Sequence, residues 1–544
     1  MAHFQRSPTE LVGEDLLLRP LKRAETGYNW NLCCMEGTRQ SLLNQIVAWT
    51  ANQPGQKDES NIYWIYGSPG IGKTALAHSI RASLHSKEQL AGAFFCRRDD
   101  PHLSETRNIL PTLIYKLARM FPPFRTIVAE RLRNDPNLTP ESMKDSLFLD
   151  FIGSLPHLRH PKRTLVLVID ALDECGNAQS RPGILNVLTS AAAQAPWLKI
   201  VITSRPETDI QRFFDAPTQS SHLKCDLATD QAAIADLRTF ARSQFDSIAS
   251  TWYLSTPWPE ESLFDTVITR ANGLFIFIKT LFLVLEQCAD PIESLESTLQ
   301  GSAGVGLSSL YGLYSSILNA RVVHSGAEFQ QMVGVLLATA PYRSICEETI
   351  AELAGVRVNL VKKWVDDLSS LLYRDEQADG GVRFRHLSIS DFFISEECHC
   401  DYRISLGDAN VRLGTSCLKV MIEQLRFNIC RLEDSRLANS DVKDLQTRIE
   451  QNISDSLQYS SLHWSNHLCF IPDDGNQGVW GSLKDFFEGL YPLFWIEVLS
   501  VMGMLRIGVP SLRELTSTLV KVSTAPTCCH WHSKTDLTFS RIRI

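Results

Sequence analysis

The chain has 544 residues, too many for one hydrophobic core, because single cores stop growing near ~250 to 300 residues. Hydrophobic residues make up 44% of the chain, which excludes an intrinsically disordered protein and favours several globular domains. The net charge of −8 provides no general attraction for nucleic acid or anionic membranes, so binding to either would require a local basic patch.

The first predicted strand, Ile62 to Tyr66, leads into a loop that reads GSPGIGKT, and a predicted helix begins at Ala75. The loop matches the pattern G-x-x-x-x-G-K-[ST], in which glycines allow successive backbone N–H groups to curl around a polyphosphate. Lys73 is placed to reach the β and γ phosphates, and Thr74 to offer its hydroxyl to Mg²⁺. An ordinary glycine-rich turn is the alternative, but the flanking strand and helix favour a site for ATP or GTP. The predicted nucleotide-binding residues are Gly67, Ser68, Pro69, Gly70, Ile71, Gly72, Lys73 and Thr74.

Further strands are predicted at Leu90 to Arg98, at Leu165 to Ile169 and from Leu198, with helices between them. This alternation predicts a doubly wound parallel sheet, which binds ligands at the carboxyl ends of its strands. Asp170 lies at such an end, and an acidic residue downstream of a phosphate loop is the expected partner of Mg²⁺. We therefore predict Thr74 and Asp170 as metal ligands. The alternative for Asp170 is an ordinary aspartate in a turn after the strand.

Three more polar residues follow the predicted strands. Asp173 and Glu174 come just after Asp170, where one of them can orient or activate a water molecule beside the γ phosphate. Their alternative role is to cap the following helix or turn. Arg205 ends the strand that begins at Leu198, where it can sense or stabilise the γ phosphate, or else lie on the surface and pair with Glu207. The predicted catalytic residues are Asp173, Glu174 and Arg205.

Three segments, YWIYGSPGIGKTALA, LVLVIDALDEC and KIVITSRPE, together resemble the NACHT nucleotide-binding domain of fungal NOD-like receptor proteins, in the form often labelled nephrocystin-3-like. Segments from Cys34, from Arg270 and around residues 425–468 are similar to the lead-in and the helical regions of the same family, so the resemblance covers about residues 30–500. It implies a STAND-class NTPase in innate-immune-type signal transduction. Such a switch is locked by ADP or GDP and is released to form homo-oligomers on exchange for triphosphate, which it hydrolyses slowly.

The segment from Phe329 to Phe393 predicts three helices followed by a β hairpin, which is the pattern of a winged helix. Many winged helices bind DNA, so a nucleic-acid-binding domain is a rival interpretation. Between Glu347 and Leu372, however, five acidic residues outnumber three basic ones, so no basic recognition helix is present. We therefore expect no nucleic-acid partner.

His386 is the candidate ligand in this predicted winged helix. With Ser388, Asp391 and Phe392 it matches the family pattern H-x-S-x-x-D-F, and the resemblance implies that its imidazole contacts the diphosphate in the closed state. A packed or solvated histidine is the alternative. The chain departs from the family at residues 273–275, Gly-Leu-Phe, where several relatives have a proline that lies against the base. The preference between ATP and GTP therefore stays open.

The expected fold is multidomain, with a P-loop NTPase sheet, a helical domain, a winged helix and a C-terminal helical region. Both ends break the helical and strand patterns, which indicates either a short family member or a truncated gene lacking effector and repeat domains. The predicted boundaries are 1–29 for an N-terminal tail, 30–216 for the NACHT domain, 217–325 for the helical domain, 326–396 for the winged helix, 397–519 for the C-terminal helical region and 520–544 for an irregular tail.

The fourteen cysteines show no repeating spacing and no secretory leader opens the chain, so reduced thiols and a cytoplasmic location are expected. The most apolar stretch, from Gly273, is interrupted by Lys279, which favours a buried helix over a membrane span. Two other function classes stay open beside the switch: a nucleotide-binding scaffold without significant hydrolysis and, less favoured, a P-loop kinase.

Overall fold

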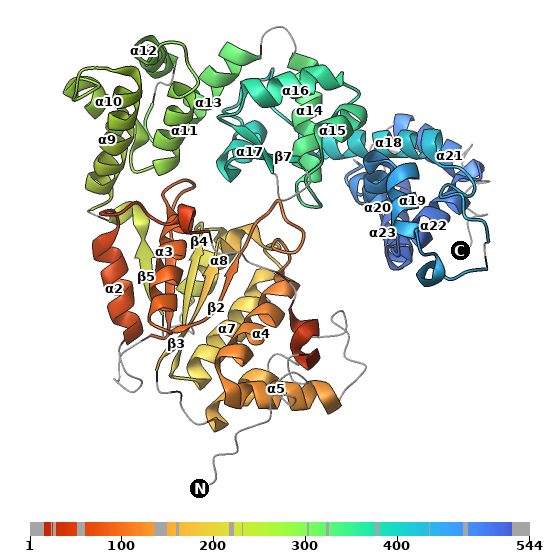
Figure 1. Cartoon of the computed structure of the whole chain (residues 1–544), viewed down its shortest axis with the longest axis horizontal. Coiled ribbons are helices and arrows are strands. Elements are labelled where there is room, and N and C mark those ends of the chain that lie inside the picture. The colour runs from red at the N-terminus through yellow and green to blue at the C-terminus, as the bar shows by residue number, and fades with distance from the viewer. Residues whose placement is uncertain are drawn as a thin grey trace. The chain divides into compact units, whose positions relative to one another are not determined.

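The structure is a computed structural model that describes residues 16–22, 24, 29–51, 60–134, 150–158, 161, 163–216, 222–230, 232–301, 304–322, 326–375, 380–434, 436–471 and 477–524. The chain divides into two compact units, Met1–Leu313 and Tyr314–Ile544 (Figure 1). Most of the predicted N-terminal tail and residues 525–544 of the predicted C-terminal tail lie outside the described residues.

A parallel five-stranded sheet forms the centre of the first unit, with the strand order β2-β3-β4-β1-β5. The first four strands of the chain read as nearly continuous apolar runs because both faces of the sheet are covered. This confirms the predicted P-loop-type parallel sheet. The strands are β1 (Ile62–Tyr66), β2 (Leu90–Phe95), β3 (Leu165–Asp170), β4 (Leu198–Ser204) and β5 (Leu223–Asp226).

Helices connect these strands, as parallel pairing requires. The core between helices and sheet contains the fully buried rings of Trp64, Phe94 and Trp197, and Trp64 stacks on Phe214 with ring centroids 4.6 Å apart. The helices of this part are α2 (Gln40–Ala51), α3 (Lys73–Ser86), α4 (Ile109–Met120), α5 (Pro122–Asn134), α7 (Arg181–Gln194) and α8 (Thr208–Asp215).

A group of helices follows the sheet in the first unit. Helix α11 is apolar apart from Lys279 and Thr280 and is largely buried, which confirms that the hydrophobic stretch from Gly273 is a buried helix. Within the described ranges, no helix combines the length and the apolar character needed to cross a membrane. The helices are α9 (Ala233–Trp252), α10 (Glu261–Ala271), α11 (Phe275–Leu285), α12 (Pro291–Gly301) and α13 (Leu307–Arg321), and the boundary between the two units falls inside α13.

The second unit opens with the predicted three helices and hairpin. Strands β6 and β7 pair antiparallel, with Leu372 opposite Phe384. Residues 376–379, between the two strands, lie outside the described part of the chain. The elements are α14 (Gly326–Thr339), α15 (Glu347–Ala354), α16 (Val358–Asp367), β6 (Leu372–Asp375), β7 (Gly381–Phe384) and α17 (Leu387–Ile394).

The rest of the second unit is helical, as predicted. Its core contains the buried indoles of Trp464 and Trp495, whose ring centroids lie 5.8 Å apart. The last helix runs to Thr524, a few residues beyond the predicted end of the helical region. The helices are α18 (Leu406–Gln424), α19 (Leu445–Asn452), α20 (Asp455–Leu468), α21 (Gln477–Glu488), α22 (Tyr491–Val501) and α23 (Leu505–Thr524).

Candidate nucleotide-binding site

The glycine-rich loop joins the carboxyl end of β1 to the first residue of α3, as the sequence predicts. Gly70 has φ +77° and Gly72 has φ +99°, values that L side chains rarely adopt. A Cβ atom on Gly70 would also lie only 2.0 Å from Cγ2 of Ile276. Glycine is therefore required at Gly70 for two separate reasons, its backbone conformation and the close approach of α11.

The backbone N–H groups of this loop are arranged as an anion site. Among the described residues, no hydrogen-bond acceptor is recorded for the N–H groups of residues 70–74. Gly72 precedes the fourteen-residue helix α3 and gives it no side-chain cap. Consecutive N–H donors at a helix N-terminus form a concave site that favours phosphate oxygens. The residues present therefore fit a polyphosphate.

Lys73 places its ammonium group within this loop. Its Nζ donates to the carbonyl oxygens of Gly67, at 2.8 Å, and Ser68, at 2.9 Å. Burial lowers the pKa of Lys73 to about 8, although the negative charge of Asp173 acts in the opposite direction. A buried ammonium held only by neutral carbonyls gains strongly from an anionic partner, which is what a bound phosphate provides.

The structure brings the two predicted metal ligands together. Asp170 ends β3 and is buried, and its Oδ1 accepts a hydrogen bond from Oγ1 of Thr203. Burial raises the pKa of Asp170 to about 6, and the hydrogen bonds from Thr203 and Thr74 partly oppose this rise. A carboxylate and a hydroxyl side by side at the end of a phosphate loop are oxygen ligands of the type that Mg²⁺ prefers.

Asp173 contacts two arginines, one through its carboxylate and one through its backbone carbonyl. Its Oδ1 accepts the backbone N–H of Arg205 at 2.9 Å, and its Oδ2 lies 3.2 Å from Nε of the same arginine. Its carbonyl oxygen accepts a hydrogen bond from Nη1 of Arg181 at 2.9 Å. Arg181 is itself paired with Asp209, with Nε 2.7 Å from Oδ2. Arg205 thus has an acidic partner at the site, in contrast to the alternative of a surface arginine.

Glu174 has a different environment from its neighbour. Its Oε2 accepts the backbone N–H of Arg98 at 3.3 Å. Burial raises the pKa of Glu174 to about 7, and the charges of Asp173 and Asp170 add to this rise. A carboxyl group that gains and loses a proton near neutral pH is suited to accept a proton from water.

Sequence reasoning missed several residues that support this site. Thr203 orients Asp170, Arg181 holds the carbonyl of Asp173, and the N–H of Ile276 donates to the carbonyl of Gly70 at 3.2 Å. Arg39 donates from Nη2 to the carbonyl of Ile71 at 3.2 Å. Arg39, Thr203 and Ile276 lie in segments that the resemblance had singled out, but no motif gave any of them a role in the site, and Arg181 lies outside those segments.

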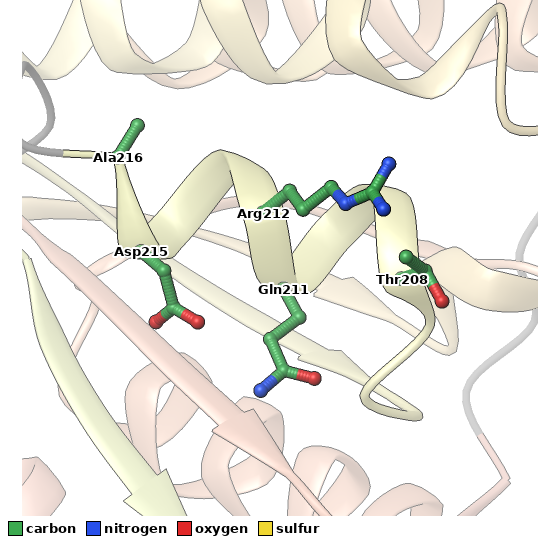
Figure 2. Close-up of a pocket in the computed structure, with 5 residues that line it drawn as sticks. All are labelled: Thr208, Gln211, Arg212, Asp215 and Ala216. Carbon is green, nitrogen blue, oxygen red and sulfur yellow. The ribbon is translucent and has the colours of Figure 1, made fainter.

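A separate pocket of about 390 Å³ lies against α8. Figure 2 shows its five lining residues, with the side chains of Gln211 and Asp215 extending to the same side of the helix. All five come from α8 and the residue after it, and none belongs to the phosphate loop or to the carboxylates beyond β3. This pocket is therefore distinct from the candidate nucleotide site.

His386 lies in the second unit, where it contacts Ser388. It is the N-cap of α17, where its Nδ1 accepts the backbone N–H of Ser388 at 3.1 Å. The hydroxyl of Ser388 lies 2.6 Å from the same nitrogen and 2.8 Å from the hydroxyl of Tyr314. Because Nδ1 accepts the cap hydrogen bond, the neutral imidazole carries its proton on Nε2, which becomes the donor nitrogen.

Comparison with known proteins agrees with this geometry. Residues 37–205 match the family described as Nephrocystin 3, N-terminal. These residues form a nephrocystin 3 N-terminal domain. The domain contains the whole phosphate loop, the carboxylates beyond β3 and Arg205, its last matched residue.

The chain is also 24% identical over 533 residues to the vegetative incompatibility protein HET-E-1 of Podospora anserina, an alignment that covers 89% of this chain and 37% of that protein. Among solved structures, domain III of the replication initiation protein DnaA of Thermotoga maritima is 16% identical over 50% of this chain and 95% of its own, with a TM-score of 0.26. Cdc6p of Pyrobaculum aerophilum is 12% identical over 66% of this chain and 90% of its own, with a TM-score of 0.30. At these TM-scores, neither likeness informs the function.

Proposed function

We propose that this chain is a nucleotide-dependent signalling switch that binds ATP or GTP with Mg²⁺, hydrolyses it slowly and controls self-association through its nucleotide state. The observation that carries this proposal is the loop from Gly67 to Thr74, whose N–H groups at residues 70–74 have no recorded acceptor in the described part of the chain. Such a loop, with the ammonium of Lys73 buried beside it, is stabilised by a polyphosphate and by few other ligands.

The side chains around the loop have distinct roles in this proposal. Thr74 and Asp170 would hold Mg²⁺, which supplies charge neutralisation for the phosphates. Glu174 accepts the proton of the attacking water, which its pKa of about 7 permits at neutral pH. Arg205 is held by Asp173, and a bound γ phosphate would compete with that carboxylate for it.

The family resemblance supports the control of assembly. In this proposal the diphosphate form is closed, with the imidazole of His386 as a contact to the diphosphate, and the triphosphate form self-associates. The name of HET-E-1 refers to vegetative incompatibility in that protein. For this chain we propose a signalling role in innate-immune-type recognition, in the cytoplasm.

The first test is the substitution Lys73→Ala. It should weaken the binding of ATP or GTP more than tenfold, because a charge-assisted hydrogen bond to phosphate contributes about 1.5 to 3 kcal/mol. Lys116→Ala is a matched control, since Lys116 is also a partly buried lysine with a pKa lowered to about 8 by burial and donates to the carbonyl of Ala93 at 2.6 Å. A calorimetric titration in which Lys73→Ala binds as tightly as wild type would refute the nucleotide site.

A nucleotide-binding scaffold is the second candidate function. One observation favours it: the carboxylate of Asp173 is held by Arg205, so of the two predicted water-activating carboxylates only Glu174 has no arginine ion pair among the described residues. Measurement of hydrolysis by the purified protein separates the candidates. Slow turnover with nucleotide-dependent assembly supports the switch, binding without turnover supports the scaffold, and transfer of phosphate to a small acceptor supports the kinase. Loss of Mg²⁺-dependent binding in Asp170→Asn would support the proposed metal ligand.

A further inference from the structure

Arg39 is a buried arginine behind the phosphate loop. It immediately precedes helix α2, has φ +55°, and leaves only 3% of its side chain exposed. Its Nη2 donates to the carbonyl of Ile71 at 3.2 Å, while its Nη1 pairs with the carboxylate of Asp230. Its backbone N–H donates to Oδ2 of Asp236 at 3.0 Å, and its guanidinium carbon lies 5.7 Å from the ring centroid of Phe275.

These contacts constrain the direction of the loop's peptide groups. Arg39 fixes the carbonyl of Ile71, and the N–H of Ile276 fixes the carbonyl of Gly70 at 3.2 Å. In a planar trans peptide, the C=O of one residue and the N–H of the next point in opposite directions. The two anchors therefore turn the N–H groups of Ile71 and Gly72 away from Arg39 and Ile276, and both of these N–H groups belong to the anion site.

The acidic partners of Arg39 belong to the start of the helical part of the unit. Oδ1 of Asp230 accepts the backbone N–H of Ala232 at 3.0 Å, just before α9, and Asp236 lies in the first turn of that helix. Both carboxylates are thus placed near the positive end of the helix dipole, which stabilises them. Arg39 joins this end of α9 to the loop through one guanidinium group.

We infer that Arg39 is a positioning residue for phosphate binding, which orients the loop's N–H groups from behind and couples their orientation to the start of α9. The inference rests on the proposed function and adds to it a residue outside the phosphate loop. Arg39 is not a ligand of the phosphates, because its guanidinium is already held by Ile71 and Asp230. Lysine cannot replace it, since a single ammonium lacks the planar fork that reaches two acceptors in fixed directions.

The test compares Arg39→Met, Arg39→Lys and the control Arg125→Met, each titrated calorimetrically with inorganic pyrophosphate and with ADP. Arg125 is a suitable control because it also donates to backbone carbonyls, those of Ala118 and Arg119, but it lies in α5, outside the loop. We expect both Arg39 variants to bind pyrophosphate and ADP about tenfold more weakly, by the same factor for each ligand. Arg125→Met should bind both ligands as wild type does.

Thermal unfolding of each variant completes the design. Arg39→Lys keeps a cation for Asp230 and should melt close to wild type while it still loses phosphate affinity, a combination that a purely structural residue would not produce. Normal pyrophosphate affinity in the folded fraction of both variants would overturn the inference. A loss of affinity for ADP alone would also overturn it, because Arg39 would then act on the nucleoside. A wild-type protein that binds neither probe would overturn the proposed function itself.

Discussion

The carboxylate of Asp173 holds both the backbone and the side chain of Arg205. Its Oδ1 lies 2.9 Å from the backbone nitrogen of Arg205, and its Oδ2 lies 3.2 Å from Nε. The side chain of Asp173 is only 2% exposed, so this pair is shielded from water. Among the described residues the adjacent Glu174 forms no such ion pair, and burial raises its pKa to about 7. The two neighbouring carboxylates therefore have different environments, and we propose that Asp173 organises Arg205 while Glu174 accepts a proton.

The first prediction separates these roles. Glu174→Gln should leave triphosphate binding near normal and lower single-turnover hydrolysis by roughly 10² to 10⁴, the usual contribution of a general base. Asp173→Asn should instead destabilise the folded protein, by up to about 3 kcal/mol, because it removes the charge that balances a partly buried arginine. Single-turnover rates corrected for the folded fraction, together with melting curves, distinguish the two variants. If Glu174→Gln hydrolyses within about twofold of wild type, Glu174 is not the base.

The second prediction concerns the contact between the phosphate loop and α11. Gly70→Ala should abolish nucleotide binding or unfold the domain, since the new Cβ would lie 2.0 Å from Cγ2 of Ile276. Ile276→Ala removes that methyl group, so the double variant should recover part of the binding. Recovery stays incomplete because the Cβ atom of residue 276 still lies 2.8 Å from the new Cβ, and because φ +77° at Gly70 still disfavours alanine. Equal defects in the single and double variants, measured by titration and by melting, would show that this contact is not the cause.

The third prediction is that binding of Mg²⁺ and nucleotide releases protons at pH 6 and takes up protons at pH 8.5. At pH 6, Asp170 and Glu174, with pKa values of about 6 and 7, are partly protonated, and Mg²⁺ favours their ionised forms. Protons should therefore be released. At pH 8.5, Lys73, with a pKa of about 8, is partly neutral, and phosphate favours its charged form, so protons should be taken up. Calorimetry in buffers of different ionisation enthalpy measures both quantities.

Two variants assign these protons. Lys73→Arg keeps a positive charge that does not titrate, so it should remove the uptake at pH 8.5. Glu174→Gln should reduce the release at pH 6, and the difference from wild type corrects for protons released by the nucleotide itself. Proton release of the same size at both pH values would contradict the pKa values of the site.

The fourth prediction concerns the lock proposed for His386. His386→Ala removes both the imidazole and the N-cap of α17, and the lost cap alone costs about 0.5 to 2 kcal/mol. His386→Asn keeps a good N-cap and removes only the imidazole. Both variants should therefore exchange diphosphate faster and self-associate more than wild type, while they still bind triphosphate. Light scattering that finds His386→Asn monomeric, with a wild-type rate of diphosphate release, would leave His386 with the capping role only.

Local sequence pattern was enough to predict most of the nucleotide-binding unit. The bounds of β1 were predicted correctly, and the loop stands between this strand and a helix as its glycines and lysine require. Strand β5 was not predicted, because its four residues, LKCD, carry no apolar run, and pairing with β1 defines the strand instead. Helix α3 begins at Lys73, two residues before the predicted start.

The different environments of the two neighbouring carboxylates could not be predicted from the sequence. Asp173 and Glu174 are adjacent and chemically alike, and only their burial and partners, Arg205 for one and the N–H of Arg98 for the other, separate them. Arg39 and Asp230 pair across 191 positions of the chain, a distance at which no local pattern operates. Contacts of this kind depend on the tertiary fold and follow from no spacing rule.

Strand β5 also affects how copies of this chain can join. It is an edge strand, and an open edge can act as a template onto which a second chain adds a strand. Here the edge is only four residues long, and its exposed Lys224 pairs with Asp215. Both features discourage strand addition, since a short edge offers few hydrogen bonds and a charged side chain resists burial. The self-association that we propose should therefore use side-chain surfaces, which can separate again, and not the near-irreversible growth of a continuous sheet.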